Sequence, residues 1–361
     1  MGEARCAVTR ERAAPGRHAL FDNTALEVSI RAGLIGSDVR ILTVLLAWII
    51  PLLATSNLAL AAPYPKRYLT LIVPVSVGGA GDFMGRLIAD RLSNALGEKV
   101  IVDNRGGASG TIAAAAVARA APDGYTLLLS SSTTHATAPA AFKALPYDPI
   151  KDFTHFGLIA TAPAVLSINA GLPPKSLTEF VDYAKRNPDQ LNYGSSGVGA
   201  PGQFWGEMFK TASKVRIVHV PYKGTAPAML DLVSGQIHVI LDGLPSQLSN
   251  IQAGAIRPLA VMSPARLPKL PAVPTMAEAG YPTVLGGLWF GLSGPAGLPK
   301  DVVDRLSAEL AKINTDPTFL DKLQSFGMIS TPMRNDDYAK FIHDEISRYG
   351  KIALETDISI N

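Results

Sequence analysis

The chain has only one cysteine, Cys6, among its 361 residues. That residue lies in an N-terminal segment that we expect to be removed, which leaves the remaining chain without a thiol. The absence excludes disulfide bonds, cysteine nucleophiles and thiolate metal sites from the remaining chain. It also excludes a lipid-anchor cysteine at the expected cleavage point.

Excess charge of one sign is also absent, because the formal net charge is only +3. Aromatic residues make up 7% of the chain, and the basic residues are scattered without aromatic residues between them. Nucleic-acid-binding proteins carry clustered positive charge that neutralises phosphates. We therefore expect no nucleic-acid partner.

One short apolar run, Ile41–Ala62, stands out near the N-terminus. Arg40 provides a positive flank, and Ala59-Leu60-Ala61 resembles a signal-peptidase site. A proline and three polar residues interrupt the run, whereas a spanning helix needs about 20 predominantly apolar residues. The pattern predicts a signal peptide over residues 41–61, cleaved near Ala61/Ala62, and a periplasmic location. A retained membrane anchor is the alternative.

Residues 1–40 carry charges of both signs and are longer than the positive region of an ordinary signal peptide. We interpret them as an N-terminal extension, with an over-extended gene start as the hypothesis. Cleavage after residue 61 would leave 300 residues of the 361. That length is sufficient for two domains of ordinary size.

The first half of the remaining chain alternates strands and helices. Leu69–Val75 is a continuous apolar strand, a glycine turn follows, and apolar residues then recur at helical spacing as far as Leu96. Strands at Lys99–Val102 and Thr126–Leu129 enclose a helix at Gly110–Ala120, and the polar segment 130–136 is expected to be a loop. This alternation predicts an open α/β sheet, whose ligands bind beyond the carboxyl ends of its strands.

Similar signals indicate a second lobe after Ala162. Val165–Asn169 and His238–Leu241 are expected strands, and a helix is expected from Ser176 to about Asn187. Glycine-rich or polar loops follow strands at residues 192–199 and 220–224. Polar loops at strand ends in two lobes predict a shared cleft. We place lobe 1 at residues 62–162 and 287–361, and lobe 2 at residues 163–286.

Eight stretches, in this order along the chain, carry a family resemblance. They are Tyr64-Pro65 with Leu71–Arg86, Val102–Ala116, Ala121–Leu128, Leu145–Phe153, Leu191–Gly197, His219–Gly224, Leu270–Gly280 and Arg348–Lys351. Together they resemble the extracytoplasmic solute receptors of tripartite tricarboxylate transporters, the Bug family. The resemblance covers almost all of Tyr64–Lys351.

The resemblance implies a two-lobed periplasmic-binding-protein fold of type II, the Venus-flytrap fold, with a ligand cleft between the lobes. It implies a receptor rather than an enzyme, without a cofactor or metal. Such a receptor would capture a small carboxylate and hand it to the membrane subunits of a transporter. The candidate ligands are di- and tricarboxylates, acidic amino acids and aromatic acids, and the receptor is expected to be a monomer.

The resemblance also implies most of the binding site. In lobe 1 the first glycine loop would hold a carboxylate through backbone amides and bound water, because amides at a helix N-terminus bind anions without an arginine. Hydroxyl groups of a second lobe 1 loop are further candidate donors. Lobe 2 would add a second nest of amides and hydroxyls, with side chains at strand ends. The candidates are Val77, Gly78, Gly79, Ala80, Asp82, Ser131, Ser132, Thr134, Ser195, Ser196, Gly197, Tyr222 and Asp242.

Each candidate has an ordinary structural alternative. The glycines suit a tight turn, and the hydroxyls suit helix capping. Asp82 repels an anion, so we expect it to cap its own helix or to orient a water molecule. Tyr222 has packing as its alternative, whereas Asp242 would suit a ligand that carries an amino or hydroxyl group. His135 has no partner at metal-ligand spacing and is expected to be structural.

Other functions remain as alternatives. A periplasmic sensor that docks on a signalling protein would have the same sequence features. A dinucleotide-dependent oxidoreductase would use Gly79-Ala80-Gly81, but Met84 occupies the position of the third glycine. A serine hydrolase elbow at Ser196 fails because Val198 replaces a glycine. Departures from the usual family pattern at Val75, Ala80 and residues 200–202 leave the individual ligand open.

Overall fold

The structure is a computed structural model that describes residues Tyr64–Ile360. The predicted N-terminal extension, the signal peptide with its cleavage point, and Cys6 lie outside these residues. Within the described part of the chain, no helix is both long enough and apolar enough to cross a membrane.

Lobe 1 is built on a sheet with the strand order β2-β1-β3-β9-β4-β10. Strand β1 pairs in parallel with β2 and β3, whereas β9 runs antiparallel to both β3 and β4. The carboxyl ends of the three parallel strands therefore lie at one edge of the sheet. The strands are β1 (Leu69–Val73), β2 (Val100–Asn104), β3 (Thr126–Ser131), β9 (Gly287–Pro295), β10 (Ile329–Arg334) and the first part of β4 (Phe153–Asn169).

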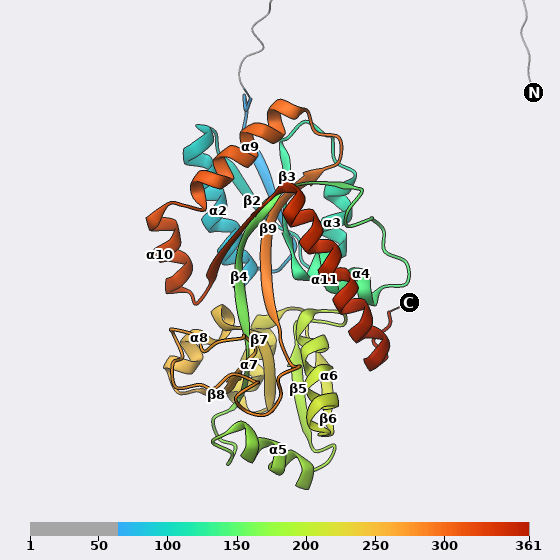
Figure 1. Ribbon diagram of the computed structural model, residues 1–361, viewed down its shortest axis with the longest axis vertical. Coiled ribbons are helices and arrows are strands. Elements are labelled where there is room, and N and C mark those ends of the chain that lie inside the picture. Colours follow the sequence, from blue (N-terminus) through green and yellow to red (C-terminus); the bar gives the residue numbers. More distant parts are fainter. Residues whose placement is uncertain (1–63, 361) are drawn as a thin grey trace, which may run out of the picture. The chain divides into compact units, whose positions relative to one another are not determined.

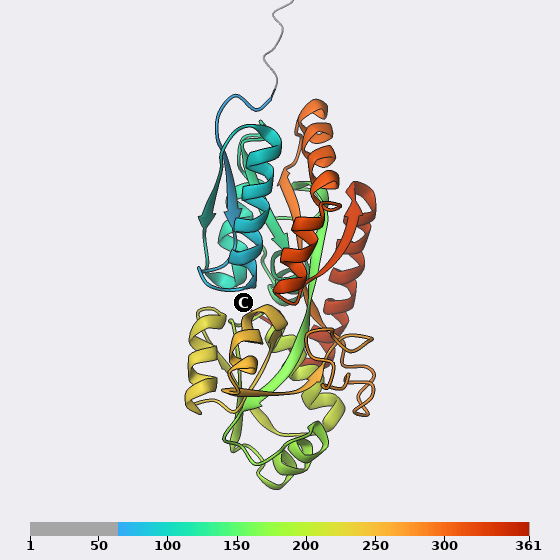
Figure 2. The ribbon, with the colours of Figure 1, turned by 90° about the vertical axis from the view of Figure 1, so that its left-hand side faces the viewer.

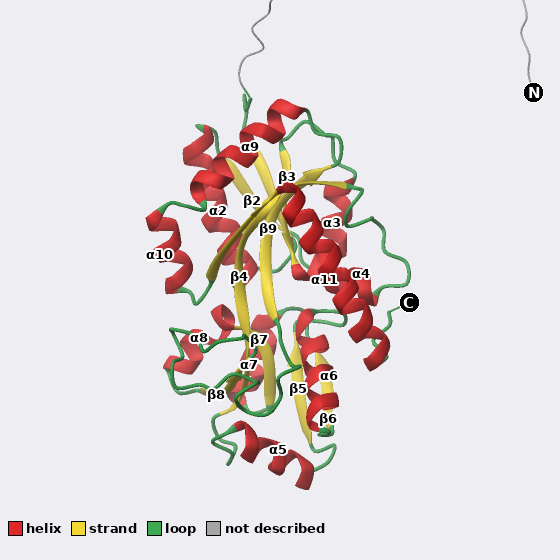
Figure 3. Ribbon diagram, in the orientation of Figure 1, coloured by secondary structure: helices red, strands yellow, loops and turns green. Residues whose placement is uncertain are grey.

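The alternation of side chains along the strands separates two helical layers, seen in red beside the yellow sheet in Figure 3. Leu71 and Val73 of β1 face a core shared with helices α2 (Ala80–Leu96), α9 (Lys300–Ile313) and α10 (Pro317–Ser325). Ile72, between them, faces a separate core shared with helix α3 (Thr111–Ala118). Successive strand residues point to opposite faces, so a fully apolar strand is buried on both.

Lobe 2 has the strand order β8-β4-β7-β5-β6, in which β5 pairs in parallel with β6 and β7. Val239 and Leu241 of β7 face one core, while Ile240 faces another that includes α7. The strands besides β4 are β5 (Leu191–Ser195), β6 (Ile217–Pro221), β7 (Val239–Gly243) and β8 (Ile256–Val261). The helices are α5 (Leu177–Arg186), α6 (Pro201–Ser213), α7 (Thr225–Ser234) and α8 (Leu244–Gln252).

Two long strands connect the lobes, as Figures 1 and 2 show. The first part of β4 pairs with β9 and β10, and its last part pairs with β7 and β8. Helix α11 (Asn335–Thr356) also contacts both lobes, because it packs on β4 and on α6. There the Trp205 indole N–H donates to the Tyr349 hydroxyl at 3.1 Å. The lobe boundaries at residues 162/163 and 286/287 stay a prediction.

The structure differs from the sequence-based expectation in two segments. The predicted loop 130–136 instead continues β3 to Ser131 and then forms a π-helical turn, η3 (Thr133–Thr137), before the short helix α4 (Ala138–Ala141). Its polar side chains other than the half-buried Thr133 are buried, and the Ser130 and Tyr338 hydroxyls bond at 2.9 Å, so polarity did not indicate exposure. The strand predicted from Val165 begins at Phe153, because β4 also serves lobe 1.

Candidate ligand-binding site between the lobes

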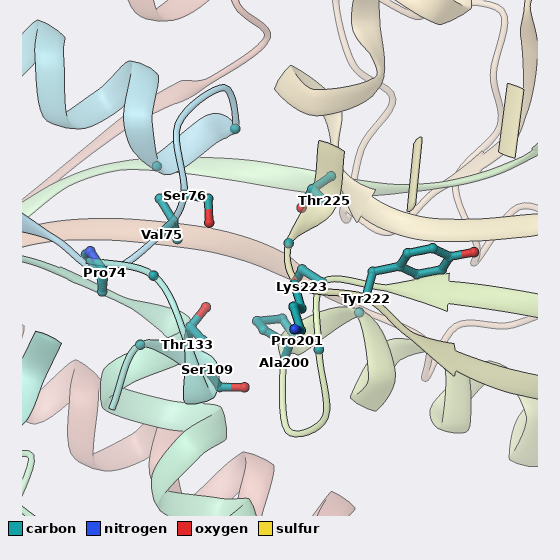
Figure 4. Close-up of a pocket in the computed structure, with 18 of the residues that line it drawn as sticks. Pro74, Val75, Ser76, Ser109, Thr133, Ala200, Pro201, Tyr222, Lys223 and Thr225 are labelled. Atoms are coloured by element: carbon teal, nitrogen blue, oxygen red, sulfur yellow. The ribbon is translucent and has the colours of Figure 1, made fainter. Parts of the chain in front are cut away.

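A cavity of about 680 Å³ lies between the two lobes. Its wall combines the loops that follow β1, β2 and β3 with those that follow β5, β6 and β7. Figure 4 shows Ser76, Ser109 and Thr133 on one side, opposite Ala200, Lys223 and Thr225 on the other. The cavity therefore lies where the predicted cleft was expected, beyond the carboxyl ends of parallel strands.

Four helices begin at this cavity. Their N-cap residues all line it: Gly79 of α2, Gly110 of α3, Ala200 of α6 and Gly224 of α7. None of the four N-termini receives a side-chain capping hydrogen bond. The first N–H groups of a helix have no intrahelical partner and carry partial positive charge. The cavity wall is therefore suited to an anion.

Of two glycine N-caps at the cavity, only Gly110 requires glycine for its backbone and surroundings. Gly110 has φ +77°, and a Cβ there would lie 3.0 Å from Pro74 Cβ and 2.9 Å from Thr134 Cγ2. Gly79 has φ −102°, and a Cβ there would meet no atom within 4 Å. Gly110 thus permits close packing of two loops, whereas Gly79 leaves open space at the cavity wall.

The structure brings eight of the thirteen predicted site residues to the cavity. All four segments of the prediction contribute at least one of them. The eight are Val77, Gly79, Ala80, Ser131, Ser196, Gly197, Tyr222 and Asp242. The other five do not line it: Asp82, Ser132, Thr134 and Ser195 are buried, whereas Gly78 is exposed.

Asp82 acts within its own helix start. Its Oδ2 accepts a hydrogen bond from the Gly78 N–H at 3.1 Å, and Oδ1 lies 3.1 Å from Arg86 Nε. Burial acts to raise the pKa of Asp82, but Arg86, the Gly78 N–H and Asn104 outweigh burial and lower it. Asp82 therefore holds the first glycine loop against α2 through a residue that precedes the helix, and it does not cap the helix N–H groups.

Thr134 belongs to a buried polar cluster behind the cavity. Its Oγ1 accepts a hydrogen bond from the Ser131 N–H at 3.2 Å and lies 2.8 Å from Nδ1 of His135. His135 is fully buried, and burial lowers its pKa well below the ordinary value. Ser132 is fully buried as well. These residues shape the turn that presents Ser131 to the cavity.

Ser195 organises the second nest without lining the cavity. Its hydroxyl oxygen lies 2.9 Å from the Gly197 carbonyl, accepts from the Gly197 N–H at 3.3 Å, and lies 2.6 Å from His219 Nε2. Burial lowers the pKa of His219 to about 4, so the imidazole is neutral at pH 7. Ser195 is only 1% exposed. The Ser195–His219 pair is therefore turned away from anything bound in the cavity.

Tyr222 and Asp242 line the cavity in different ways. The Tyr222 ring points away from the opposite lobe in Figure 4, and its hydroxyl donates to Asp231 Oδ2 at 2.7 Å. Asp242 accepts hydrogen bonds from Thr225 Oγ1 at 2.8 Å and from the Gly243 N–H at 2.6 Å. Burial raises the pKa of Asp242 to about 6, although these two donors act to lower it. Asp242 therefore changes charge close to neutral pH.

Sequence reasoning missed Lys223, which is exposed and lines the cavity from lobe 2. Within the described part of the chain, no carboxylate forms an ion pair with it. The sequence could have indicated Lys223, because it directly follows the predicted site residue Tyr222, just after the end of β6. Loop 106–110 at the end of β2 was missed despite its glycines. Phe142 and Ile360 also line the cavity and carry no signal in the sequence.

The turn invoked for a dinucleotide site, Gly79-Ala80-Gly81, lines the cavity, but two other residues of that motif do not. Asp103, which follows this turn at about the spacing of a ribose-binding aspartate, does not line the cavity and instead pairs with Arg105 at 2.8 Å. Met84 is fully buried in the lobe 1 core. Among residues 64–360, no group of three or more histidine, aspartate or glutamate side chains is placed to hold a metal ion.

The family described as "Tripartite tricarboxylate transporter family receptor" matches residues 84–358. Protein BugT of Bordetella pertussis is 34% identical over 322 residues, covering 87% of this chain and 98% of BugT.

Two solved structures from Rhodopseudomonas palustris are also similar. The structure of Rpa4515 with adipate is 38% identical and has a TM-score of 0.80, covering 82% of this chain and all of that one. The structure of MatC with bound malate is 33% identical and has a TM-score of 0.75, covering 80% of this chain and 99% of that one.

These similarities confirm both the predicted family and the predicted two-lobed fold of type II. They extend over both lobes, and their alignments cover at least four-fifths of this chain. The chain therefore belongs to the tripartite tricarboxylate transporter receptors, the Bug family of periplasmic solute-binding receptors.

Proposed function

We propose that this protein captures a small carboxylate in the cavity between its lobes and hands it to the membrane subunits of a tripartite tricarboxylate-type transporter. The observation that carries the proposal is the convergence of four helix N-termini, none with a side-chain cap, on one cavity. Aligned N–H groups stabilise an anion that enters the cavity.

Lys223 supports a ligand with a second anionic group. Its ammonium is the cationic side chain of the cavity wall, on the lobe opposite Ser76 and the α2 N-terminus (Figure 4). One carboxylate at α2 and a second near Lys223 would place the ligand across both lobes. A dicarboxylate such as adipate or malate has this form, and structures of two similar proteins are described with these ligands.

Asp242 refines this ligand class further. Its carboxyl group lines the cavity and already accepts two hydrogen bonds. An ionised Asp242 favours ligands that bring an amino or hydroxyl donor to it, since an anionic group there would be repelled. Acidic amino acids and hydroxy acids such as malate fit this preference, and tricarboxylates and aromatic acids are screened beside them as the remaining ligand classes.

The test begins with expression of the full chain in a bacterial host and purification of the periplasmic form. N-terminal sequencing is expected to find a start near Ala62, and retention in the membrane would contradict cleavage. The thermal unfolding midpoint is then measured with mono-, di- and tricarboxylates, acidic amino acids, aromatic acids and NAD. A ligand that binds the folded state raises the midpoint by mass action.

A shift with one or a few carboxylates is the expected result. A shift with NAD alone would support the oxidoreductase alternative and contradict the proposal. Delivery to a transporter is tested separately, by co-purification with the transporter membrane subunits in the native host. Co-purification with a histidine-kinase ectodomain instead would favour the sensor alternative. Size-exclusion chromatography with light scattering tests the expected monomer.

A further inference from the structure

A direct hydrogen bond joins the two lobes at the edge of the cavity. The Ser109 hydroxyl, in the loop after β2, donates to the Val198 carbonyl in the loop after β5, with 2.6 Å between the oxygens. Both residues line the cavity. The bond connects lobe 1 to lobe 2 across 89 positions of sequence. It therefore forms only when these two loops are brought together.

The Ser109 side of this contact has an unusual backbone. Ala108 has φ 45° and Ser109 has φ 51°, although neither is glycine, and they are enclosed by Gly107 at φ 113° and Gly110 at φ 77°. Residues with a side chain rarely adopt such angles, because Cβ then approaches the neighbouring carbonyl oxygen. Strained residues of this kind cluster at binding loops and clamps.

The Val198 side is held from both lobes. Within lobe 2, the Gly199 N–H donates to Gln203 Oε1 at 2.7 Å, and the hydroxyl oxygen of Ser195 lies 2.9 Å from the Gly197 carbonyl. Towards lobe 1, Gly199 packs so closely on the C-terminal segment that a Cβ there would lie 2.7 Å from Ile360 Cδ1. The loop thus sits between Ser109 and Ile360.

We propose that Ser109 is a positioning residue that clasps the lobes closed over the ligand. The cross-lobe clasp consists of Ser109 and the loop 196–199. By holding the Val198 carbonyl, Ser109 also fixes the neighbouring Ser196 and Gly197 at the cavity wall. The consequence for affinity depends on the proposed carboxylate binding, whereas the effect on lobe closure does not.

The physical basis is a shift between two conformations. In an open conformation the Ser109 hydroxyl and the Val198 carbonyl bond to water, and in the closed conformation they bond to each other. An interaction made only in the closed conformation raises its population by its net free energy. One intramolecular hydrogen bond changes the closed-to-open ratio by about twofold to tenfold.

Two substitutions at Ser109 separate the hydroxyl from the backbone. Ser109→Ala removes the hydroxyl and keeps Cβ, whereas Ser109→Gly removes both and suits the positive φ. Ser246→Ala is the matched control, because Ser246 lines the same cavity but donates to the Gly243 carbonyl within lobe 2 at 2.8 Å. Circular dichroism and thermal unfolding confirm that each variant is folded.

Lobe closure is measured by small-angle X-ray scattering, first without added ligand and then during titration with adipate and with malate. Without ligand, both Ser109 variants are expected to have a larger radius of gyration than the wild type. They are also expected to need about twofold to tenfold more ligand to become compact. The Ser246→Ala control is expected to match the wild type without ligand.

Identical radii for the wild type and Ser109→Ala under every condition would overturn the clasp. Recovery of wild-type compaction by Ser109→Gly would also overturn it, because the effect would then arise from backbone strain. If neither adipate nor malate compacts any variant, the scattering without ligand still decides the clasp. Failure of the clasp and failure of carboxylate binding are therefore distinguishable.

Discussion

The helix N-termini at the cavity differ from two N-termini elsewhere in the molecule. Helix α5 begins at Ser176, whose hydroxyl accepts from the Glu179 N–H, and α10 begins at Asp316, whose carboxylate accepts from the Phe319 N–H. The helices α2, α3, α6 and α7 begin at glycine or alanine without any side-chain cap. These four N-caps line the cavity, whereas Ser176 and Asp316 do not.

Absence of a side-chain cap is not confined to the cavity, because α8, α9 and α11 also begin without one and their N-cap residues do not line it. For α5, α10 and the four helices at the cavity, the difference separates stability from binding. A side-chain cap satisfies the first N–H groups of a helix and stabilises the folded state. The same N–H groups without a cap are available to an anionic ligand. Glycine and alanine at the cavity therefore fit a wall whose donors serve the ligand, while serine and aspartate elsewhere serve the fold.

The largest expected effect comes from Gly79→Val at the start of α2. Its side chain would extend into open space at the cavity wall and block close approach of the ligand, so we expect at least a hundredfold loss of affinity, about 2.7 kcal/mol. The fold should persist. Isothermal titration calorimetry with the carboxylate found in the screen measures the loss.

Gly350→Val is the matched control for this substitution. Gly350 in α11 also lacks a positive φ, has no atom within 4 Å of an added Cβ, and does not line the cavity. The control should bind like the wild type. Unchanged affinity in Gly79→Val would remove the first glycine loop from the site.

The second prediction compares Asp242, which lines the cavity, with Asp316, the N-cap residue of α10. In the folded state burial raises the pKa of Asp242 to about 6, above its ordinary value of 3.8. Between these pH values the folded protein holds a proton that the unfolded chain has lost, so this group's contribution to stability falls as pH rises. The free energy of unfolding of Asp242→Asn minus that of the wild type should therefore be about 2 kcal/mol larger at pH 7 than at pH 4.

Asp316→Asn should show the opposite trend. The Thr318 hydroxyl and the Phe319 N–H lower the pKa of Asp316, so its contribution is present above the unfolded pKa and is lost as pH falls. Urea unfolding of both variants and the wild type measures the two differences, between pH 4 and pH 7 for Asp242 and down to pH 2 for Asp316. Parallel pH profiles for all three proteins would contradict the assignment of Asp242 as a buried carboxyl group.

The third prediction concerns the cation of the cavity wall. Lys223→Gln keeps a polar side chain without the charge, and it should raise the Kd for a dicarboxylate about fivefold to tenfold at low salt. The difference should shrink as salt increases. Lys210→Gln is the control, because Lys210 pairs with Glu207 at 2.7 Å and does not line the cavity. Equal affinities for Lys223→Gln and wild type would place the second anionic group elsewhere.

The smallest expected effect is at a capped N-terminus. Ser176→Ala should lower the free energy of unfolding by about 1 kcal/mol, because the Glu179 N–H loses its acceptor. Ligand affinity should stay the same, since Ser176 does not line the cavity. Denaturant titration and calorimetry measure the two quantities. A change in affinity would contradict the separation between helix starts that serve the fold and those that serve the ligand.

Most of the fold could be predicted from local patterns in the sequence. Apolar runs such as Leu69–Val73 and helical spacing over α2 are properties of a few neighbouring residues, and the structure contains both elements. The loops after β1 and β5 were placed at the cleft because parallel strands present their carboxyl ends at one edge. Element ends were less accurate where burial overrode polarity, as at Ser131, or where one strand serves both lobes, as β4 does.

The sequence by itself therefore determined the family, the α/β alternation and the loops that carry the site. Only the tertiary structure decided which side chains of those loops face the cavity, as the contrast between Ser195 and Ser196 shows. It also decided the burial that raises the pKa of Asp242 and the meeting of Ser109 with Val198. Periodicity reports contacts between near neighbours, whereas these features depend on how two long strands bring distant segments together.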